Sequence, residues 1–169
     1  MADEKPRHQV LLRTLIFVFK GDQLLLMRYS GKGTNLSKEK SDRKDYYNPI
    51  GGHVEKGEDI IESAKKEAQE EVGIILADPK IKGIIHVDGF AGKNMVNFII
   101  AGTTGDEPIK SSLEGDLEWV NKDDVPNLNV FKDIGPILNE LLSMKPGEIF
   151  TGVAKFEGFD LKELDINVI

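Results

Sequence analysis

The chain of 169 residues contains no cysteine and has no excess of positive charge. Without cysteine, disulfide bonds, thiolate nucleophiles and cysteine-ligated zinc or iron–sulfur centres are excluded. The 22 lysines and arginines are outnumbered by 29 aspartates and glutamates, which gives a net charge of −7. This balance argues against a nucleic acid polymer or an anionic membrane as the main partner, because both attract basic surfaces. A small anionic ligand remains compatible with this charge if a metal ion mediates its binding.

Long apolar runs are also absent. No stretch approaches the roughly 18 apolar residues of a membrane-spanning helix, and the initial MADEKPRHQV has no apolar signal core. We therefore expect a cytoplasmic protein that has no membrane partner. The length is typical of one domain, residues 1–169, in which about two-thirds of the unfolded surface becomes buried.

The hydrophobic pattern predicts more strands than helices. Two apolar runs flank Gly21-Asp22, a pair typical of hairpin turns. The polar segment 31–45 contains glycines, has no period and predicts a long inserted loop. Strands are expected over residues 14–19, 23–29, 80–90 and 94–104, a strand end and a turn or helix start over 117–126, and a closing pair of short strands over 148–169.

Two segments have the period of an amphipathic helix. The first runs from Asp59 to Val72 and is followed by Gly73, a typical C-terminal stop. The second is residues 131–144. The apolar stripes are Ile61, Ala64, Ala68 and Val72 in the first helix, and Ile137, Leu138, Leu141 and Leu142 in the second. Because two such helices can cover opposite faces of one sheet, we expect the α+β class, with a mixed β-sheet flanked by helices.

Three carboxylates share one flank of the first predicted helix. Glu67, Glu70 and Glu71 follow a spacing of three and four residues, which places their side chains close together. Two unit charges ~4 Å apart near a protein surface repel by ~4 kcal/mol. A divalent cation would relieve this repulsion, and oxygen ligands suit Mg²⁺ or Mn²⁺. A solvated acidic helix is the alternative, but the preceding Gly51-Gly52 favours a site, since glycine allows close backbone approach.

The segment GGHVEKGEDIIESAKKEAQEEVGI, residues 51–74, resembles the Nudix box of the Nudix hydrolases. That motif is glycine, five residues, glutamate, seven residues, arginine-glutamate-aliphatic, one residue, two glutamates, one residue and glycine-aliphatic. Here Lys66 replaces the arginine, and lysine offers a point charge in place of a rigid planar fork. The resemblance extends from about Leu12 to the end of the chain, and it implies a Nudix-type α/β/α sandwich.

The resemblance implies a Mg²⁺-dependent hydrolase, with Mn²⁺ as a possible substitute, that cleaves a nucleoside diphosphate linked to another group. It assigns Glu67, Glu70, Glu71 and the carbonyl of Gly51 to the metal. One carboxylate would activate the attacking water, and we favour Glu67.

Other positions would support this centre. The resemblance gives Glu58 and Lys66 a role in holding the box in place. Many members of the family add a metal ligand from a loop just ahead of a strand that bears a tryptophan. In LEGDLEWV, Glu114 is our candidate for this ligand, and Glu118 is the alternative.

The stretch YNPIGG resembles the segment of MutT-type enzymes in which an asparagine reads the base of an oxidised purine nucleoside triphosphate. That asparagine is Asn48 here, whose amide can donate and accept on a purine edge. LLLMRY and FTGVAKFEGFDLKEL resemble two further segments of the same branch. The predicted substrate-binding residues are Asn48, Arg28, Thr14 and Asp133, and Phe19, Tyr29 and Tyr46 are candidates for stacking on a base.

The resemblance thus implies a small nucleotide partner, 8-oxo-dGTP or a related purine triphosphate, which would be cleaved to a monophosphate and pyrophosphate in sanitation of the nucleotide pool. Two alternatives remain open. One is a pyrophosphatase for ADP-ribose or a nucleotide sugar. The other is a Nudix domain that binds nucleotides without turnover, which the Lys66 departure would permit. The sequence does not indicate an oligomeric state.

Overall fold

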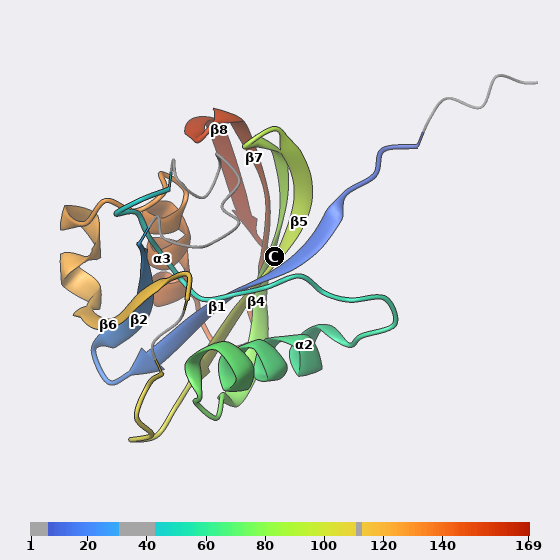
Figure 1. Ribbon diagram of the computed structural model, residues 1–169. Coiled ribbons are helices and arrows are strands. Elements are labelled where there is room, and N and C mark those ends of the chain that lie inside the picture. The colour runs from blue at the N-terminus through green and yellow to red at the C-terminus, as the bar shows by residue number, and fades with distance from the viewer. Residues whose placement is uncertain (1–6, 31–42, 111–112) are drawn as a thin grey trace, which may run out of the picture.

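A computed structural model describes residues 7–30, 43–110 and 113–169. Its centre is a mixed sheet in which β1–β5 and β4–β7 are parallel pairs and the other pairs are antiparallel (Figure 1). The strands are β1 (Leu11–Lys20), β2 (Gln23–Tyr29), β3 (Tyr47–Asn48), β4 (Ala77–Phe90), β5 (Lys93–Thr103), β6 (Gly115–Asn121), β7 (Phe150–Gly158) and β8 (Asp160–Val168). Their order is β3-β2-β1-β5-β4-β7-β8, with β6 also paired to β2.

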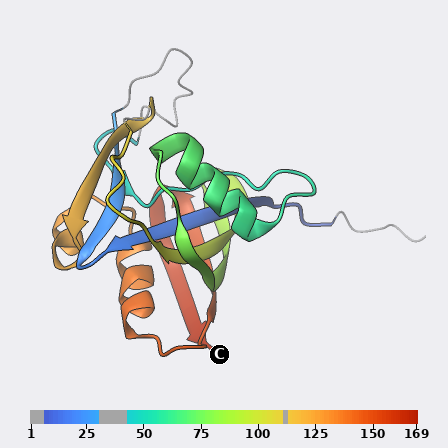
Figure 2. The ribbon, with the colours of Figure 1, turned by 90° about the horizontal axis from the view of Figure 1, so that it is seen from below.

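The helical elements are α2 (Ile60–Glu67), the π-helix η1 (Ala68–Val72), the 3₁₀ helix η2 (Lys122–Asn127) and α3 (Ile134–Ser143). Helices α2 and α3 cover opposite faces of the sheet (Figure 2). Alternation along β1 explains how one strand supports both layers. Leu15 and Phe17 belong to the apolar cluster that contains Ile137 of α3, whereas Ile16 belongs to the cluster that contains Ala64 of α2. The predicted α/β/α sandwich is confirmed.

Strand β1 parts from β2 soon after their turn, and this divergence positions the site. Cα pairing between the two strands is confined to Phe19↔Leu24 and Lys20↔Gln23. The part of β1 away from this turn forms hydrogen bonds, along the same edge, with the segment before α2. Three backbone N–H groups make these bonds: Ile16 N–H donates to Ile50 O at 2.7 Å, Thr14 to Gly52 at 2.9 Å and Val54 to Leu12 at 3.0 Å. The glycine pair of the motif is therefore fixed against the central sheet.

The first predicted helix forms, but it changes character halfway. Asp59 begins it by accepting hydrogen bonds from the backbone N–H groups of Ile61 and Glu62 at 2.9 and 3.1 Å. The helix widens to a π turn at Ala68 and ends at Gly73, whose φ of 81° is the left-handed conformation that glycine favours. The predicted stop at Gly73 is confirmed, whereas the π turn was not expected.

The second predicted helix is shorter than residues 131–144, since α3 begins at Ile134. The prediction that Leu142 points inward is wrong, because its side chain is 48% exposed. Ile134, Ile137, Leu138 and Leu141 follow the spacing i, i+3, i+4 and i+7 and pack on the sheet, which leaves Leu142 at the margin of the stripe.

The other strands and the predicted loop differ from the sequence predictions in length or coverage. The closing strand pair forms, but β7 and β8 have nine residues each and are not short. The two-residue strand β3 was not predicted. Most of the predicted loop 31–45, residues 31–42, lies outside the described residues, and residues 43–45 form a turn. No helix of the described residues is long and apolar enough to cross a membrane.

Candidate active site

The two glycines ahead of α2 are required by what lies against them. A Cβ atom on Gly51 would lie 2.1 Å from the backbone oxygen of Thr14, and a Cβ on Gly52 would lie 2.3 Å from the Glu67 carboxyl carbon. The buried Thr14 hydroxyl accepts a hydrogen bond from Gly52 N–H at 3.2 Å. The glycine segment is thus held by β1 on one side, while its other side receives the Glu67 carboxylate.

Three of the predicted acidic residues line one cavity of about 420 Å³, which we call the acidic cavity. Its carboxylates include Glu67, Glu71 and Glu114, and Gly51 also lines it. A volume of this size is within the range typical of ligand sites. The structure therefore brings together residues from the helix, the glycine segment and the loop before β6.

The electrostatics of this cavity are unfavourable for bare carboxylates. Burial raises the pKa of Glu71 to about 7, and the negative charges of Glu67 and Glu114 add to that effect. Burial likewise raises the pKa of Glu67. Proton uptake or a cation would relieve this crowding.

The donor set fits Mg²⁺ or Mn²⁺, since these carboxylates and the nearby Gly51 carbonyl are all oxygen ligands. Among residues 7–30, 43–110 and 113–169, no three His, Asp or Glu side chains already surround a single point. The carboxylates share the cavity without forming a closed cage. Mg²⁺ commonly uses only one or two protein carboxylates and keeps water or phosphate oxygens as its other ligands.

Glu70 lies apart from the other two helix carboxylates. It is exposed and is not part of the wall of the acidic cavity, which Glu67 and Glu71 both line. The π turn accounts for this difference. A π turn holds more residues than an α turn, so the position three residues after Glu67 rotates further away while the position four residues after it stays nearly aligned.

The predicted supporting pair, Glu58 and Lys66, joins the loop before α2 to the last turn of this helix. Lys66 Nζ is 3.5 Å from Glu58 Oε1, and Glu58 Oε2 accepts a hydrogen bond from Glu55 N–H at 3.0 Å. Glu58 therefore connects the helix to the loop before it. The charge of Glu58 raises the pKa of Lys66, whereas Lys65 takes Glu62 as its partner.

Of the two candidates for the extra metal ligand, Glu114 lines the acidic cavity. Glu118 lies elsewhere on β6, where it accepts a hydrogen bond from the Tyr47 hydroxyl at 3.3 Å and lies 3.7 Å from Arg28 Nε. Arg28 also contacts Asp116 at 3.2 Å. Neither Arg28 nor Glu118 lines the acidic cavity.

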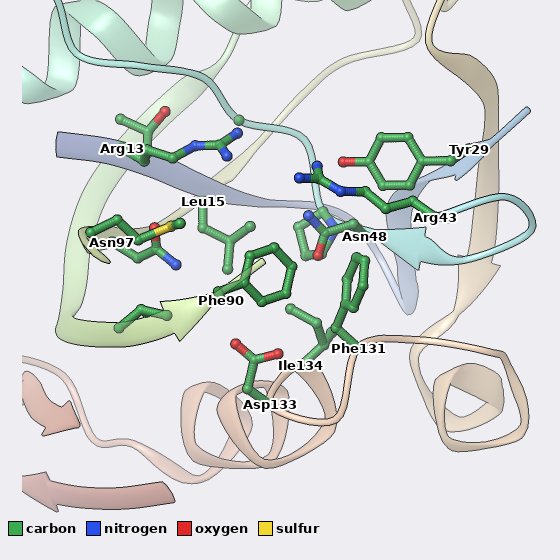
Figure 3. Close-up of a pocket in the computed structure, with 15 residues that line it drawn as sticks. Arg13, Leu15, Tyr29, Arg43, Asn48, Phe90, Asn97, Phe131, Asp133 and Ile134 are labelled. Carbon is green, nitrogen blue, oxygen red and sulfur yellow. The ribbon is translucent and has the colours of Figure 1, made fainter. Parts of the chain in front are cut away.

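A second, narrow cavity of about 50 Å³ adjoins the first (Figure 3). We call it the narrow cavity. Its wall contains three predicted substrate-binding residues, Asn48, Thr14 and Asp133, together with the rings of Phe90 and Phe131. Asp133 is only 6% exposed, and its burial raises the pKa of the carboxyl group to about 6. Asn48 and Asp133 are thus polar groups in a wall that combines polar and apolar side chains.

The walls of the two cavities contain one of the aromatic residues that the sequence indicated and two that it did not. Of the three stacking candidates, Tyr29 lines both cavities, whereas Phe19 and Tyr46 line neither. Tyr46 stacks on the ring of Phe131 at 4.7 Å between ring centroids. Phe90 and Phe131 were missed because apolar residues at a strand end and before a helix carry no signal that separates a ligand wall from a core.

Two arginines of the site were also missed. Arg13 on β1 and Arg43 before β3 line both cavities. Arg13 was detectable in principle as a charge next to a buried apolar run. Arg43 had no signal beyond its position in a polar loop.

The comparisons with known proteins agree with this geometry. The NUDIX domain family model matches residues 11–141. The uncharacterized Nudix hydrolase YvcI of Bacillus subtilis is 28% identical over 105 residues, which cover 59% of this chain and 66% of that protein. The matched region therefore spans just under two-thirds of this relative.

Two of the similar solved structures are of MutT proteins. A mutator MutT protein from Bacillus halodurans is 27% identical, with a TM-score of 0.77 over 94% of this chain and 98% of that one. A MutT protein from Methanosarcina mazei has a TM-score of 0.64 at 20% identity, over 83% and 99% of the two chains, and so supports the fold alone. The motif, the fold and the family model lead to one conclusion: this chain belongs to the Nudix hydrolase family.

Proposed function

We propose that the protein is a Mg²⁺-dependent nucleotide pyrophosphohydrolase, and that its substrate is 8-oxo-dGTP or a related oxidised purine nucleoside triphosphate. The products would be the nucleoside monophosphate and pyrophosphate. The observation that carries this proposal is the contact between two unlike cavities. The acidic cavity has the carboxylates for a metal and phosphates, and the adjoining narrow cavity has polar groups that suit a base.

We assign different roles to the carboxylates of the acidic cavity: metal binding and removal of a proton from water. Glu67, Glu71 and Glu114 would hold the metal together with the Gly51 carbonyl. Glu70 does not line the acidic cavity, and it is proposed as a further ligand because of its position in the motif. A bound metal ion lowers the pKa of water and offsets charge on the phosphate oxygens. Glu67, packed against Gly52, is our candidate for the group that takes the proton of the attacking water. Glu58 and Lys66 would tie the last turn of α2, next to Glu67, to the loop before the helix.

The polar groups of the narrow cavity could distinguish an oxidised purine from an ordinary one. An 8-oxo-purine carries an N–H donor at position 7 beside a carbonyl at position 8, whereas an ordinary guanine carries an acceptor at position 7. The Asn48 amide can donate and accept, and the buried Asp133 carboxylate can accept from N–H groups of the base. A purine could thus be identified by hydrogen bonds along its edge while Phe90 or Phe131 packs on its face.

A measurement of turnover distinguishes the proposed enzyme from a Nudix domain that binds nucleotides without cleaving them. The assay measures monophosphate and pyrophosphate from 8-oxo-dGTP with Mg²⁺ and with excess chelator, well above pH 7 so that Glu71 is ionised. We expect both products in equal amounts and only when Mg²⁺ is present. Binding of nucleotides without turnover of any of them would leave the non-catalytic alternative, for which the retained Glu67 and Glu71 have no evident use.

A further inference from the structure

The Arg43 side chain is half-buried in an unusual setting. Its guanidinium carbon lies 5.5 Å from the ring centroid of Phe90, 5.7 Å from that of Phe159 and 6.0 Å from that of Tyr29. Ring faces attract a cation, but they leave the N–H groups in the guanidinium plane without acceptors. The Nε atom is indeed buried without a hydrogen-bond partner, and no ion pair of the described residues includes Arg43.

Arg13 approaches Arg43 from the opposite wall. Figure 3 shows the two guanidinium groups extending toward each other from different elements. Burial lowers the pKa of Arg13, and the positive charge of Arg43 acts in the same direction. Within the described part of the chain, Arg13 has no carboxylate at ion-pair distance either. Two like charges facing each other in a partly buried place favour the binding of an anion between them.

The position of the pair identifies the anion. Arg13 and Arg43 line both cavities, whereas Asn48 lines only the narrow cavity and Glu71 only the acidic one. A nucleotide whose base lies in the narrow cavity and whose metal-bound phosphates lie in the acidic cavity must pass this shared wall. The part of a nucleotide that lies between base and terminal phosphates is the sugar with its first phosphate.

We propose that Arg13 and Arg43 form a guanidinium clamp for the α-phosphate of the nucleotide, an inference that rests on the function proposed above. On binding, Arg43 moves from the aromatic rings to the phosphate. This movement also enlarges the narrow cavity, whose 50 Å³ is well below the roughly 300 Å³ at the lower end of ligand pockets. Arg13 and Arg43 would thus bind the substrate although they lie outside the motif of residues 51–74.

Binding without metal isolates the clamp from catalysis. The probes are 8-oxo-dGMP, which has the α-phosphate, and the nucleoside 8-oxo-deoxyguanosine, which lacks it, both titrated calorimetrically in excess chelator. If turnover assays show a different preferred nucleotide, its monophosphate and nucleoside replace these probes. Arg43→Gln and Arg13→Gln remove one charge each, and Lys44→Gln is the matched control, an exposed cation next to Arg43 that lines neither cavity.

We expect each arginine variant to raise the Kd of the monophosphate at least about tenfold and the Kd of the nucleoside less than twofold, because a charge-assisted hydrogen bond to phosphate is lost. Lys44→Gln should leave both Kd values unchanged. Equal weakening of both probes would overturn the clamp in favour of a base contact, and an unchanged monophosphate Kd would also overturn it. Arg43→Lys keeps the positive charge but lacks the planar guanidinium group, and it is used if the glutamine variant does not fold. It should give an intermediate loss of affinity for the monophosphate. If the wild-type protein turns over no nucleotide at all, the proposed function itself fails, which is a different result.

Discussion

The acidic cavity and the narrow cavity lie side by side, but the chain builds them in different ways. Most acidic groups of the first come from one continuous segment, residues 51–74, joined by Glu114. The second collects Thr14 from β1, Asn48 from β3, Phe90 from β4 and Asp133 from the start of α3. The groups that we assign to the reaction are thus encoded locally, whereas the groups that we assign to the choice of substrate depend on the assembled sheet.

The largest expected effect concerns the acidic cavity. Glu67→Gln and Glu70→Gln each replace a carboxylate by a neutral amide of similar shape, and we expect kcat to fall at least about a hundredfold because metal binding or proton removal is lost. Steady-state kinetics with Mg²⁺ measures this effect. Glu62→Gln is the control, since Glu62 is exposed on the same helix and pairs with Lys65 at 2.7 Å. An active Glu70→Gln variant would remove the exposed Glu70 from the metal shell.

The next largest effects are expected from replacing Gly51 and Gly52, which border the acidic cavity. The Cβ atom in Gly52→Ala would displace the end of the flexible Glu67 side chain, whereas the Cβ in Gly51→Ala would collide with the Thr14 backbone. We expect Gly52→Ala to keep its melting temperature within a few degrees and to lose about a hundredfold in kcat, since a small misplacement of a reacting group has that scale of effect. Gly51→Ala should lower the melting temperature substantially.

Gly135→Ala is the control for both variants, because no atom lies within 4 Å of its added Cβ. It should leave kcat unchanged and should not lower stability, because alanine favours a helix more than glycine does. A fully active Gly52→Ala protein would show that the position of Glu67 against Gly52 is not needed for turnover.

The buried Asp133 predicts a pH effect on stability in the narrow cavity. Its pKa rises from an ordinary 3.8 to about 6 on folding because of burial, so the native state holds the proton more tightly than the unfolded state. The contribution of Asp133 to stability should therefore be greatest below about pH 4 and should be lost as pH rises through 6, by roughly 3 kcal/mol in total. Asp133→Asn avoids this loss, so its advantage over the wild type should grow by about that amount between pH 4 and pH 7.

Urea denaturation of both proteins across this pH range measures the difference. Turnover of 8-oxo-dGTP by Asp133→Asn should fall even though the variant is more stable at neutral pH. An advantage that does not change with pH would contradict the assigned pKa shift.

The smallest expected effect is one of selectivity. Asn48→Ala removes an amide from the narrow cavity, and we expect the ratio of kcat/KM for 8-oxo-dGTP over dGTP to fall about tenfold through the loss of hydrogen bonds to the base. Asn139→Ala, at an exposed position on α3, is the matched control. An unchanged ratio would place recognition of the base on other residues.

The same comparison explains what could be read from the sequence. The helical period and the capping residue Asp59 are local features, and so the helix, its stop at Gly73 and the clustering of Glu67 with Glu71 followed from the sequence. The π turn did not follow, because a change in helix type has no signature in the hydrophobic pattern, and it is what separates Glu70 from the cavity. Arg43 and Phe131 meet only after distant segments pack, so no local pattern could indicate that they share a wall.

In the proposed complex, one nucleotide spans both cavities, with an oxidised purine in the narrow cavity and its phosphates in the acidic one. The most direct test is kcat/KM, measured with Mg²⁺, for 8-oxo-dGTP, dGTP, ADP-ribose and a dinucleoside polyphosphate. We expect 8-oxo-dGTP to have the highest value, at least about tenfold above that of dGTP. A highest value for ADP-ribose or the dinucleoside polyphosphate, or equal values for the two triphosphates, would contradict it.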